Sequence, residues 1–554
     1  MRQIIEQTIK KVLKELGVKP VKFSVEHPEN MAWGDYTTNV GIITHKAEEI
    51  GAKLKAEESL NKIASKIEVK GAGFINISIK SDALVSQVNQ VLKGNWEKPL
   101  LGKKISVEYT DPNPFKEFHL GHLYSNLIGE AIAKIFEASG VTVWRGNFYG
   151  DVGMHVAKSV WGMQQKLTKE KIAIKDLEKK SIKDRQNFLG QGYALGVRAF
   201  EEDEKIKKEI TELNKKIYDK DESVKEIYEA GLSWSLEYFE TYYKRLGTKF
   251  DGYYPESKVA VLGKKLVEKG LKKGVLEKSE GAVVFKGEKY GLHTRVFLNK
   301  FGLPTYEAKD LGLAQAKYQD FKYDRSLNVF GKEIDEYYRV VKKTLELIEP
   351  ELGKKAEWLA HGMVKLPEGK MSSRSGNVIT ADWLLNEAKG LIQKNFKCDD
   401  EVAEQIGLGA VKYALLKSGI GQDVIFDFAK SISFEGNSGP YLQYTYARAR
   451  SVLKKAHLQG DSSQVCEESP YCNQEEEILL RSLVRFEETI VQAAEELAPD
   501  VVAKFLYDLA QKFNSFYNKH RVIGNDFRLW LTSATGEILK KGLGLLGISA
   551  PEKM

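Results

Sequence analysis

The sequence His119-Leu120-Gly121-His122 places two imidazole side chains at the expected start of a helix. A β-branched stretch at residues 105–109 precedes it, and an apolar run with helical spacing follows at residues 120–136. A helix N-terminus directs backbone N–H groups and the positive end of its dipole toward an anion. The imidazoles would add donors for charge that develops on a phosphate, and Gly121 would let a flat ligand such as adenine approach closely. This segment therefore predicts a nucleotide site.

A second polar string, Lys370-Met371-Ser372-Ser373-Arg374, combines cations with small hydroxyl side chains and would cover the other end of a triphosphate. Either string alone is weak, because short polar sequences of this kind are common on protein surfaces. Their neighbours make the pair more specific. Asn113 and Lys116 precede the first string, and Gly150-Asp151-Val152-Gly153 and residues 302–310 follow it in order.

Together these strings resemble the signature motifs of the class I aminoacyl-tRNA synthetases, and in this order they resemble the arginyl-tRNA synthetase family over nearly the whole chain. The resemblance implies an enzyme that activates L-arginine with ATP, giving arginyl-adenylate and pyrophosphate. Arginine would then pass to the 3′ end of tRNA(Arg). ATP would enter as its Mg²⁺ complex, and no tightly bound protein metal is expected.

The resemblance also implies a role for each matching position. The catalytic side chains would be His119, His122, Lys370 and Lys116. The ATP-binding residues would be His119, Gly121, His122, Lys370, Met371, Ser372 and Ser373. The arginine-binding residues would be Glu108, Asn113, His155, Tyr306 and Asp310. The tRNA-binding residues would be Phe74, Asn76, Tyr441, Tyr444 and Arg448.

Selection of arginine requires buried anions that face a planar guanidinium with five donors. Glu108 and Asp310 supply carboxylates, and Tyr306 lies four residues before Asp310, on the same face if the stretch is helical. Lysine in such a pocket would leave carboxylates unpaired, so no editing site is required. Two structural alternatives remain open: Glu108 could form a strand-edge salt bridge, and Asp310 could cap a helix.

The chain departs from the family pattern at four positions. Ser373 stands where the general class pattern has a second lysine, which leaves open whether Lys116 or Lys370 dominates. Val152 and His155 replace a common Trp and Gln. Ile334 occupies a position where the family often has Gln or His, and it is therefore not included in the site.

Composition limits the class of protein. With 554 residues, 42% hydrophobic and 29% charged, the chain is long enough for three or four globular domains. Its formal charge of +7 permits a polyanionic partner such as tRNA. The three cysteines form no Cys-x-x-Cys pair, and no apolar run is long enough for a membrane span. We expect a cytoplasmic monomer without a DNA or membrane partner.

The expected fold class is α/β with three units. Residues 1–100 predict a small α/β appended domain, with helices at residues 4–16 and 54–67. Residues 101–396 predict a Rossmann-like catalytic domain with a helical insertion at about residues 159–280. Strands at residues 282–285 and 295–298 would resume that domain. Residues 397–554 are almost wholly helical in pattern, and the resemblance implies that they form an α-helical anticodon-binding domain.

The residues expected to contact tRNA could instead have purely structural roles. Phe74 and Asn76 would share one face of a strand, where a ring can stack on an unpaired base and an amide can read its edge. Phe74 could instead belong to the core, as could Tyr441 and Tyr444. Residues 542–547 match the pattern Gly-x-Gly-x-x-Gly, but they follow a helix rather than a strand, so no nicotinamide or flavin is implied.

Three rival functions fit parts of the sequence. A class I synthetase for another amino acid, such as lysine, would share the two signature strings. A small nucleotidyltransferase would not need the N-terminal unit or the long helical C-terminal region. A tRNA-binding protein that has lost catalysis would not need His119, His122 and Lys370.

Overall fold

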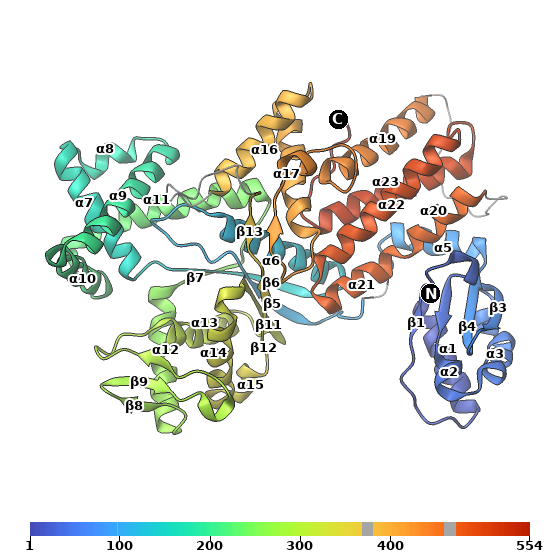
Figure 1. Ribbon diagram of the computed structural model, residues 1–554, viewed down its shortest axis with the longest axis horizontal. Coiled ribbons are helices and arrows are strands. Elements are labelled where there is room, and N and C mark those ends of the chain that lie inside the picture. The colour runs from blue at the N-terminus through green and yellow to red at the C-terminus, as the bar shows by residue number, and fades with distance from the viewer. Residues whose placement is uncertain (97, 368–379, 459–472) are drawn as a thin grey trace.

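The computed structural model describes residues 1–96, 98–367, 380–458 and 473–554 (Figure 1). The N-terminal α/β unit lies beside the C-terminal helices, away from a central parallel sheet (Figure 1). Among the described helices, none is long and apolar enough to cross a membrane.

The N-terminal unit is built on an antiparallel sheet in the order β1-β2-β4-β3. Its strands are β1 (Val25–Glu26), β2 (Tyr36–Thr38), β3 (Ala64–Lys70) and β4 (Phe74–Ile79). Its helices are α1 (Arg2–Glu15), η1 (Met31–Trp33), α2 (Val40–Thr44), α3 (Ala47–Ala56), α4 (Glu58–Asn61) and α5 (Ser81–Leu92). The helix expected at residues 54–67 is wrong in its second half. There Ile67 and Val69 alternate inward on β3 and pair with Ile77 and Ile75 of β4, so sheet pairing overrides the local spacing.

The central sheet has five parallel strands in the order β12-β11-β5-β6-β7. They are β5 (Lys104–Glu108), β6 (Thr142–Tyr149), β7 (Gly252–Pro255), β11 (Arg325–Gly331) and β12 (Ala356–His361). The strand order reverses between β5 and β11. Ligands of open parallel sheets bind at the carboxyl ends of strands at such a reversal. This topology confirms the Rossmann-like fold and places the expected crevice after β5.

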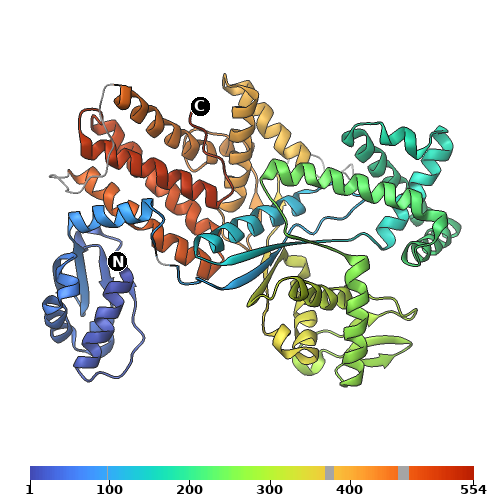
Figure 2. The same cartoon turned by 180° about the vertical axis from the view of Figure 1, so that it is seen from behind.

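Helices cover both faces of this sheet, as Figure 2 shows. One face carries α6 (Leu120–Ala138) and α11 (Glu222–Leu246), and the other carries α12 (Glu256–Lys272), α13 (Tyr306–Asp320) and α14 (Asp335–Ile348). Side chains of consecutive residues in an extended chain point to opposite faces. Accordingly, Tyr109 donates a hydrogen bond to Glu130 of α6, whereas Glu108 pairs with Lys317 of α13.

The segment between β6 and β7 is helical, as expected for an insertion. It comprises α7 (Met154–Glu170), α8 (Ile174–Glu178), α9 (Ile182–Glu202), α10 (Glu204–Tyr218) and α11. The main sheet resumes earlier than the sequence indicated, because β7 pairs with β6. The expected strands at residues 282–285 and 295–298 exist, but they are β9 (Ala282–Phe285) and β10 (Arg295–Leu298) of a separate antiparallel sheet with β8 (Glu277–Ser279). Three short helical elements complete this part of the chain: η2 (Glu288–Tyr290), η3 (Lys332–Ile334) and α15 (Pro350–Gly353).

The C-terminal region is a bundle of helices. Its helices are α16 (Ala381–Asn395), α17 (Asp400–Leu416), α18 (Phe428–Ser431), α19 (Gly439–Leu458), α20 (Gln474–Val484), α21 (Phe486–Glu496), α22 (Pro499–Lys519) and α23 (Asp526–Leu545). A two-stranded sheet joins β13 (Val364–Lys365) to β14 (Val424–Ile425). Gly542 lies inside α23 against Leu506, so the Gly-x-Gly string serves helix packing.

Lys412 lies where the C-terminal helices meet the unit that contains the central sheet. Its Nζ donates to the carbonyl oxygen of Leu246 at 2.8 Å, at the end of α11, and to that of Gly547 at 2.5 Å, just beyond α23. Burial lowers the pKa of the Lys412 ammonium to about 7, with a contribution from nearby Lys134. One side chain therefore holds two helix ends from different parts of the chain.

Candidate active site and tRNA-facing surfaces

The loop between β5 and α6 has a strained backbone. Thr110, Asp111 and Phe115 have φ angles of 87°, 46° and 66°, in the left-handed region that favours glycine. Helix α11 holds this loop, because Ser235 Oγ accepts a hydrogen bond from the Phe115 N–H at 2.8 Å. Gly231 makes this approach possible, since a Cβ there would lie 2.2 Å from the Phe115 ring. Strain of this kind is typical of functional loops that the surrounding structure fixes.

The two histidines form the first turn of α6. His119 is the N-cap, and its Nδ1 accepts from the N–H groups of Gly121 at 3.1 Å and His122 at 3.3 Å. His122 Nδ1 accepts from the His119 N–H at 3.4 Å, and the rings stack with centroids 3.5 Å apart. Because Nδ1 of each ring is an acceptor, the proton of the neutral imidazole lies on Nε2. Both Nε2–H groups are therefore available as donors.

Both imidazoles are neutral at physiological pH. Burial and then the positive charge of Lys116 lower the pKa of His119 to about 4. Burial, His119 and Lys116 lower the pKa of His122 well below its ordinary value. Lys116 Nζ lies 4.9 Å from the centre of the Tyr193 ring of α9, so the insertion contacts this cation. The turn can thus donate hydrogen bonds to phosphate without itself carrying a charge.

Asp310 lies in the second turn of α13, and its carboxylate accepts a hydrogen bond from a neutral group. Tyr337 donates its hydroxyl proton to the carboxylate. Burial raises the pKa of Asp310 to about 7, the Tyr337 hydrogen bond opposes that rise, and Glu108 adds to it. The N-cap of α13 is Thr305, so the alternative that Asp310 caps the helix is wrong.

Glu108 lies on β5 in the middle of the sheet, so the alternative of a strand-edge salt bridge is wrong in its position, although a salt bridge is present. It nevertheless has an internal cation, because Lys317 of α13 forms a buried ion pair with it. Lys317 Nζ also donates to Asn328 Oδ1 at 2.9 Å. Glu108 therefore has a cationic partner, whereas Asp310 accepts a hydrogen bond from a hydroxyl group and forms no ion pair with any described residue.

Asn113 and His155 converge on the backbone of Gly150. A Cβ at Gly150 would lie 3.2 Å from Asn113 Oδ1 and 3.3 Å from the His155 ring, so a larger residue there would press against both side chains. His155 Nε2 donates to the Gly150 carbonyl at 3.0 Å, and burial with Lys116 lowers the His155 pKa to about 4. The neutral ring therefore has its Nδ1 lone pair available as an acceptor.

Tyr306 is the first residue of α13, and its side chain is 59% exposed. Lys309 Nζ lies 5.0 Å from the centre of its ring and pairs with the buried Glu256 at 2.5 Å. The ring thus forms an outer wall at the start of the helix that carries Asp310.

The partners of the two pocket carboxylates were not among the expected site residues. The sequence did not identify Lys317 and Tyr337; the seven-residue spacing from Asp310 to Lys317, two helical turns, was the available signal.

The expected ATP-binding residues Lys370, Met371, Ser372 and Ser373 lie outside the described residues. Within the described part of the chain, no three His, Cys, Asp or Glu side chains are grouped so as to hold a metal ion.

The expected N-terminal contact residues share one face of β4. Phe74 is 42% exposed, so its assignment to the core is wrong. Asn76 is 8% exposed, and its Oδ1 accepts from Thr37 Oγ1 at 2.7 Å. That hydrogen bond fixes the amide and leaves an exposed ring two residues away.

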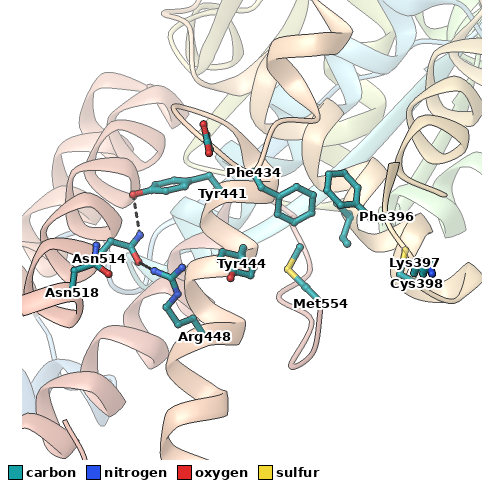
Figure 3. Close-up of a pocket in the computed structure, with 12 residues that line it drawn as sticks. Phe396, Lys397, Cys398, Phe434, Tyr441, Tyr444, Arg448, Asn514, Asn518 and Met554 are labelled. Atoms are coloured by element: carbon teal, nitrogen blue, oxygen red, sulfur yellow. Dashed lines mark hydrogen bonds between the residues drawn. The ribbon is translucent and has the colours of Figure 1, made fainter. Parts of the chain in front are cut away.

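The expected C-terminal residues line one cavity of about 630 Å³ (Figure 3). Arg448 donates to Asn514 Oδ1 at 2.6 Å, and its guanidinium lies 4.9 Å from the centre of the Tyr444 ring. Asn514 Nδ2 donates to the Tyr441 hydroxyl at 2.9 Å. The sequence analysis missed the apolar side of the cavity, which comprises Phe396, Phe434 and Met554.

Comparisons with known proteins identify the family to which the chain belongs. Three family models match the chain: "Arginyl tRNA synthetase N terminal domain" at residues 1–79, "tRNA synthetases class I (R), catalytic domain" at 83–428 and "DALR anticodon binding domain" at 442–554. An arginine–tRNA ligase of Bacteroides fragilis is 31% identical and covers 92% of this chain and 90% of its own length. One of Flavobacterium psychrophilum is 31% identical, with coverages of 93% and 92%.

A solved structure, the arginyl-tRNA synthetase of Thermus thermophilus, aligns over 100% of both chains with a TM-score of 0.82 and 26% identity. These matches give no support to the alternative of a class I synthetase for lysine. The chain belongs to the arginyl-tRNA synthetase family.

Proposed function

We propose that the chain is an arginine–tRNA ligase that forms arginyl-adenylate from L-arginine and ATP and then transfers arginine to tRNA(Arg). The observation that carries the proposal is the first turn of α6, where two neutral imidazoles hold Nε2–H donors. In the activation step, the arginine carboxylate attacks the α-phosphorus of ATP and pyrophosphate leaves. The reactants supply nucleophile and leaving group, so alignment and preorganised donors suffice.

In this proposal each phosphate contact has a distinct task. His119 and His122 donate to phosphate oxygens as charge builds at the reacting phosphorus. Lys116 supplies positive charge beside them, as its effect on their pKa values indicates. Lys370, with Met371, Ser372 and Ser373, serves the far end of the triphosphate on the strength of the family resemblance alone. ATP binds as its Mg²⁺ complex.

Arginine selection rests on Asp310, which accepts the guanidinium, while Glu108 with Lys317 shapes the floor of the pocket. Asp310 supports this role because its one resolved partner is a hydroxyl rather than a cation. Tyr306 covers the side chain of the substrate. Asn113 Oδ1 and His155 Nδ1 accept hydrogen bonds from its α-ammonium group.

Two distant surfaces would hold tRNA(Arg). The exposed Phe74 stacks on an unpaired base, and Asn76 reads that base through its free amide protons. Tyr441, Tyr444 and Arg448 receive anticodon bases in the cavity of Figure 3, where rings and a guanidinium meet. The proposal takes residues 1–100, 101–396 and 397–554 as its three functional units, in a cytoplasmic monomer.

The test is ATP–pyrophosphate exchange with each of the twenty amino acids, with and without tRNA. Arginine and close guanidino analogues should support exchange, and the family resemblance leads us to expect little exchange without tRNA. Equal stimulation by lysine would overturn the proposed specificity. Sedimentation at micromolar protein checks the monomer.

A further inference from the structure

A second cavity, of about 230 Å³, lies between the end of β6 and helix α11. Its walls include three tyrosines, a phenylalanine, an amide and a carboxylate, namely Tyr149, Tyr243, Tyr253, Phe239, Asn147 and Glu240. Among the described residues that line it, none is lysine or arginine. The function proposed above uses none of these side chains.

This cavity lies on the opposite face of the central sheet from the arginine pocket. Along β6, the Asn147 and Tyr149 side chains point to the α11 face, where Asn147 contacts Tyr243. The pocket with Glu108 and Asp310 lies on the α13 face, as the Glu108–Lys317 pair shows. A ligand in the second cavity is therefore separated from the arginine pocket by the sheet itself.

Asn147 has one unsatisfied polar atom at this cavity. The residue is 1% exposed, and its Nδ2 donates to the Tyr243 hydroxyl at 2.9 Å. Its Oδ1 is buried and accepts no hydrogen bond from any described residue. Buried carbonyl oxygens nearly always have a donor, so a ligand for this site should carry one.

The carboxylate and the aromatic rings that line the cavity limit which chemical group can be the donor. Glu240 is exposed on α11 and accepts the hydroxyl proton of Tyr253 at 2.5 Å. Tyr253 is 45% exposed, whereas Phe239 and Tyr243 are buried. Aromatic faces with one carboxylate and one open carbonyl attract a cation, and a planar cation stacks on rings while its edge donates hydrogen bonds.

We propose that this cavity binds a guanidinium group, with N–H groups donating to Asn147 Oδ1 and Glu240 and its flat faces against the tyrosine rings. A compact ammonium would meet the charge but could not stack. The group could come from free L-arginine or from an arginine side chain of a peptide. The proposal is independent of the function proposed for the α13 face.

The test uses equilibrium dialysis of radiolabelled methylguanidine with the full chain. The active site is first filled with the sulfamoyl analogue of arginyl-adenylate, and a parallel series uses Asp310→Asn. One equivalent should remain bound in both series. Binding that disappears in both would overturn the inference, and it would do so without bearing on arginine activation.

Glu240→Gln should weaken methylguanidine binding about tenfold, because a charge-assisted hydrogen bond becomes a neutral one. The matched control is Glu237→Gln on the same helix, an exposed carboxylate paired with Arg185. Equal effects of the two substitutions, or tighter binding of methylammonium than of methylguanidine, would overturn the proposal. Both positions are exposed, so the melting temperature should not change.

Competition then identifies the source of the guanidinium. L-Arginine and the tripeptide Gly-Arg-Gly are each titrated against bound methylguanidine. Displacement by the amino acid alone assigns the cavity to free arginine, and displacement by the peptide alone assigns it to a polypeptide. If neither displaces the probe, the proposed chemistry is wrong.

Discussion

The phosphate end and the arginine end of the crevice hold their polar groups by different means. At the phosphate end, backbone N–H groups of α6 fix two neutral imidazoles, and their pKa values lie far below neutrality. At the arginine end, buried carboxylates are restrained by Lys317 and by the Tyr337 hydroxyl. Burial of an unpaired neutral donor costs less free energy than burial of an unpaired charge, so the carboxylates have the greater need of partners.

The strongest test of this contrast is Asp310→Asn. Removal of a buried carboxylate whose hydrogen-bond donor is a hydroxyl rather than a cation should lower kcat/KM for arginine by about three orders of magnitude, since the guanidinium would lose a counter-charge on binding. Exchange kinetics over a range of arginine concentrations measure the effect. Asp320→Asn, at the exposed end of the same helix, is the control and should behave as wild type.

The next effect concerns His119. The amide nitrogen of Gln reaches nearer to the position of imidazole Nε2, whereas that of Asn replaces Nδ1. His119→Asn should therefore lower the activation rate by roughly two orders of magnitude, and His119→Gln should retain more activity. Arginine affinity, measured by dialysis, should stay nearly constant in both. Equal losses in the two variants would mean that the Nε2 donor is not what the reaction uses.

A smaller effect is expected at Tyr337. Asp310 has a pKa of about 7, so arginine affinity should fall as pH drops below 7 and the carboxylate becomes protonated. Tyr337→Phe removes the hydrogen bond that lowers this pKa, so the midpoint should move to higher pH, with a loss of about tenfold near pH 7. Tyr323→Phe breaks a hydrogen bond to a backbone carbonyl instead and should leave the midpoint in place.

The smallest expected effect is at Lys116. Lys116→Gln removes a nearby positive charge, so the pKa of His119 should rise by roughly half a unit from about 4. It should remain well below 6.5, because burial is the larger cause. Titration of the His119 ring by NMR measures the shift. A pKa close to 6.5 in the variant would assign the neutral state of the imidazole to Lys116 instead.

The sequence predicted the elements that carry the phosphate donors because strand, loop and helix follow one another locally. Because Tyr306 and Asp310 are only four residues apart, the sequence also predicted that they lie on one helix. The sequence did not predict β3, because the apolar spacing at residues 54–67 also fits a helix. The strand is identified only by its pairing with β4. Nor did the sequence assign residues 282–285 to a separate sheet, because alternation does not reveal which strands pair.

Pairings between distant segments were harder to predict, even where helical spacing gave a signal for one partner. Lys317 of α13 reaches Glu108 of β5, and Tyr337 reaches Asp310 from the next helix. The exposed state of Phe74 could not be predicted either, because an apolar side chain at that strand position suits both core and surface. In each case long-range packing decides the outcome.

The buried Lys412 ties the stability of the protein to proton binding. In the unfolded chain this ammonium titrates near 10.5, whereas in the folded chain it does so at about 7. Between these values the unfolded chain binds more protons, so the free energy of unfolding gains up to about 1.4 kcal/mol per pH unit from this group as pH rises. Below pH 7 the cost of burying the charge is present in full. The contact between the two helix ends therefore contributes most to stability in mild alkali, where the neutral amine still has two protons to donate to its two carbonyl partners.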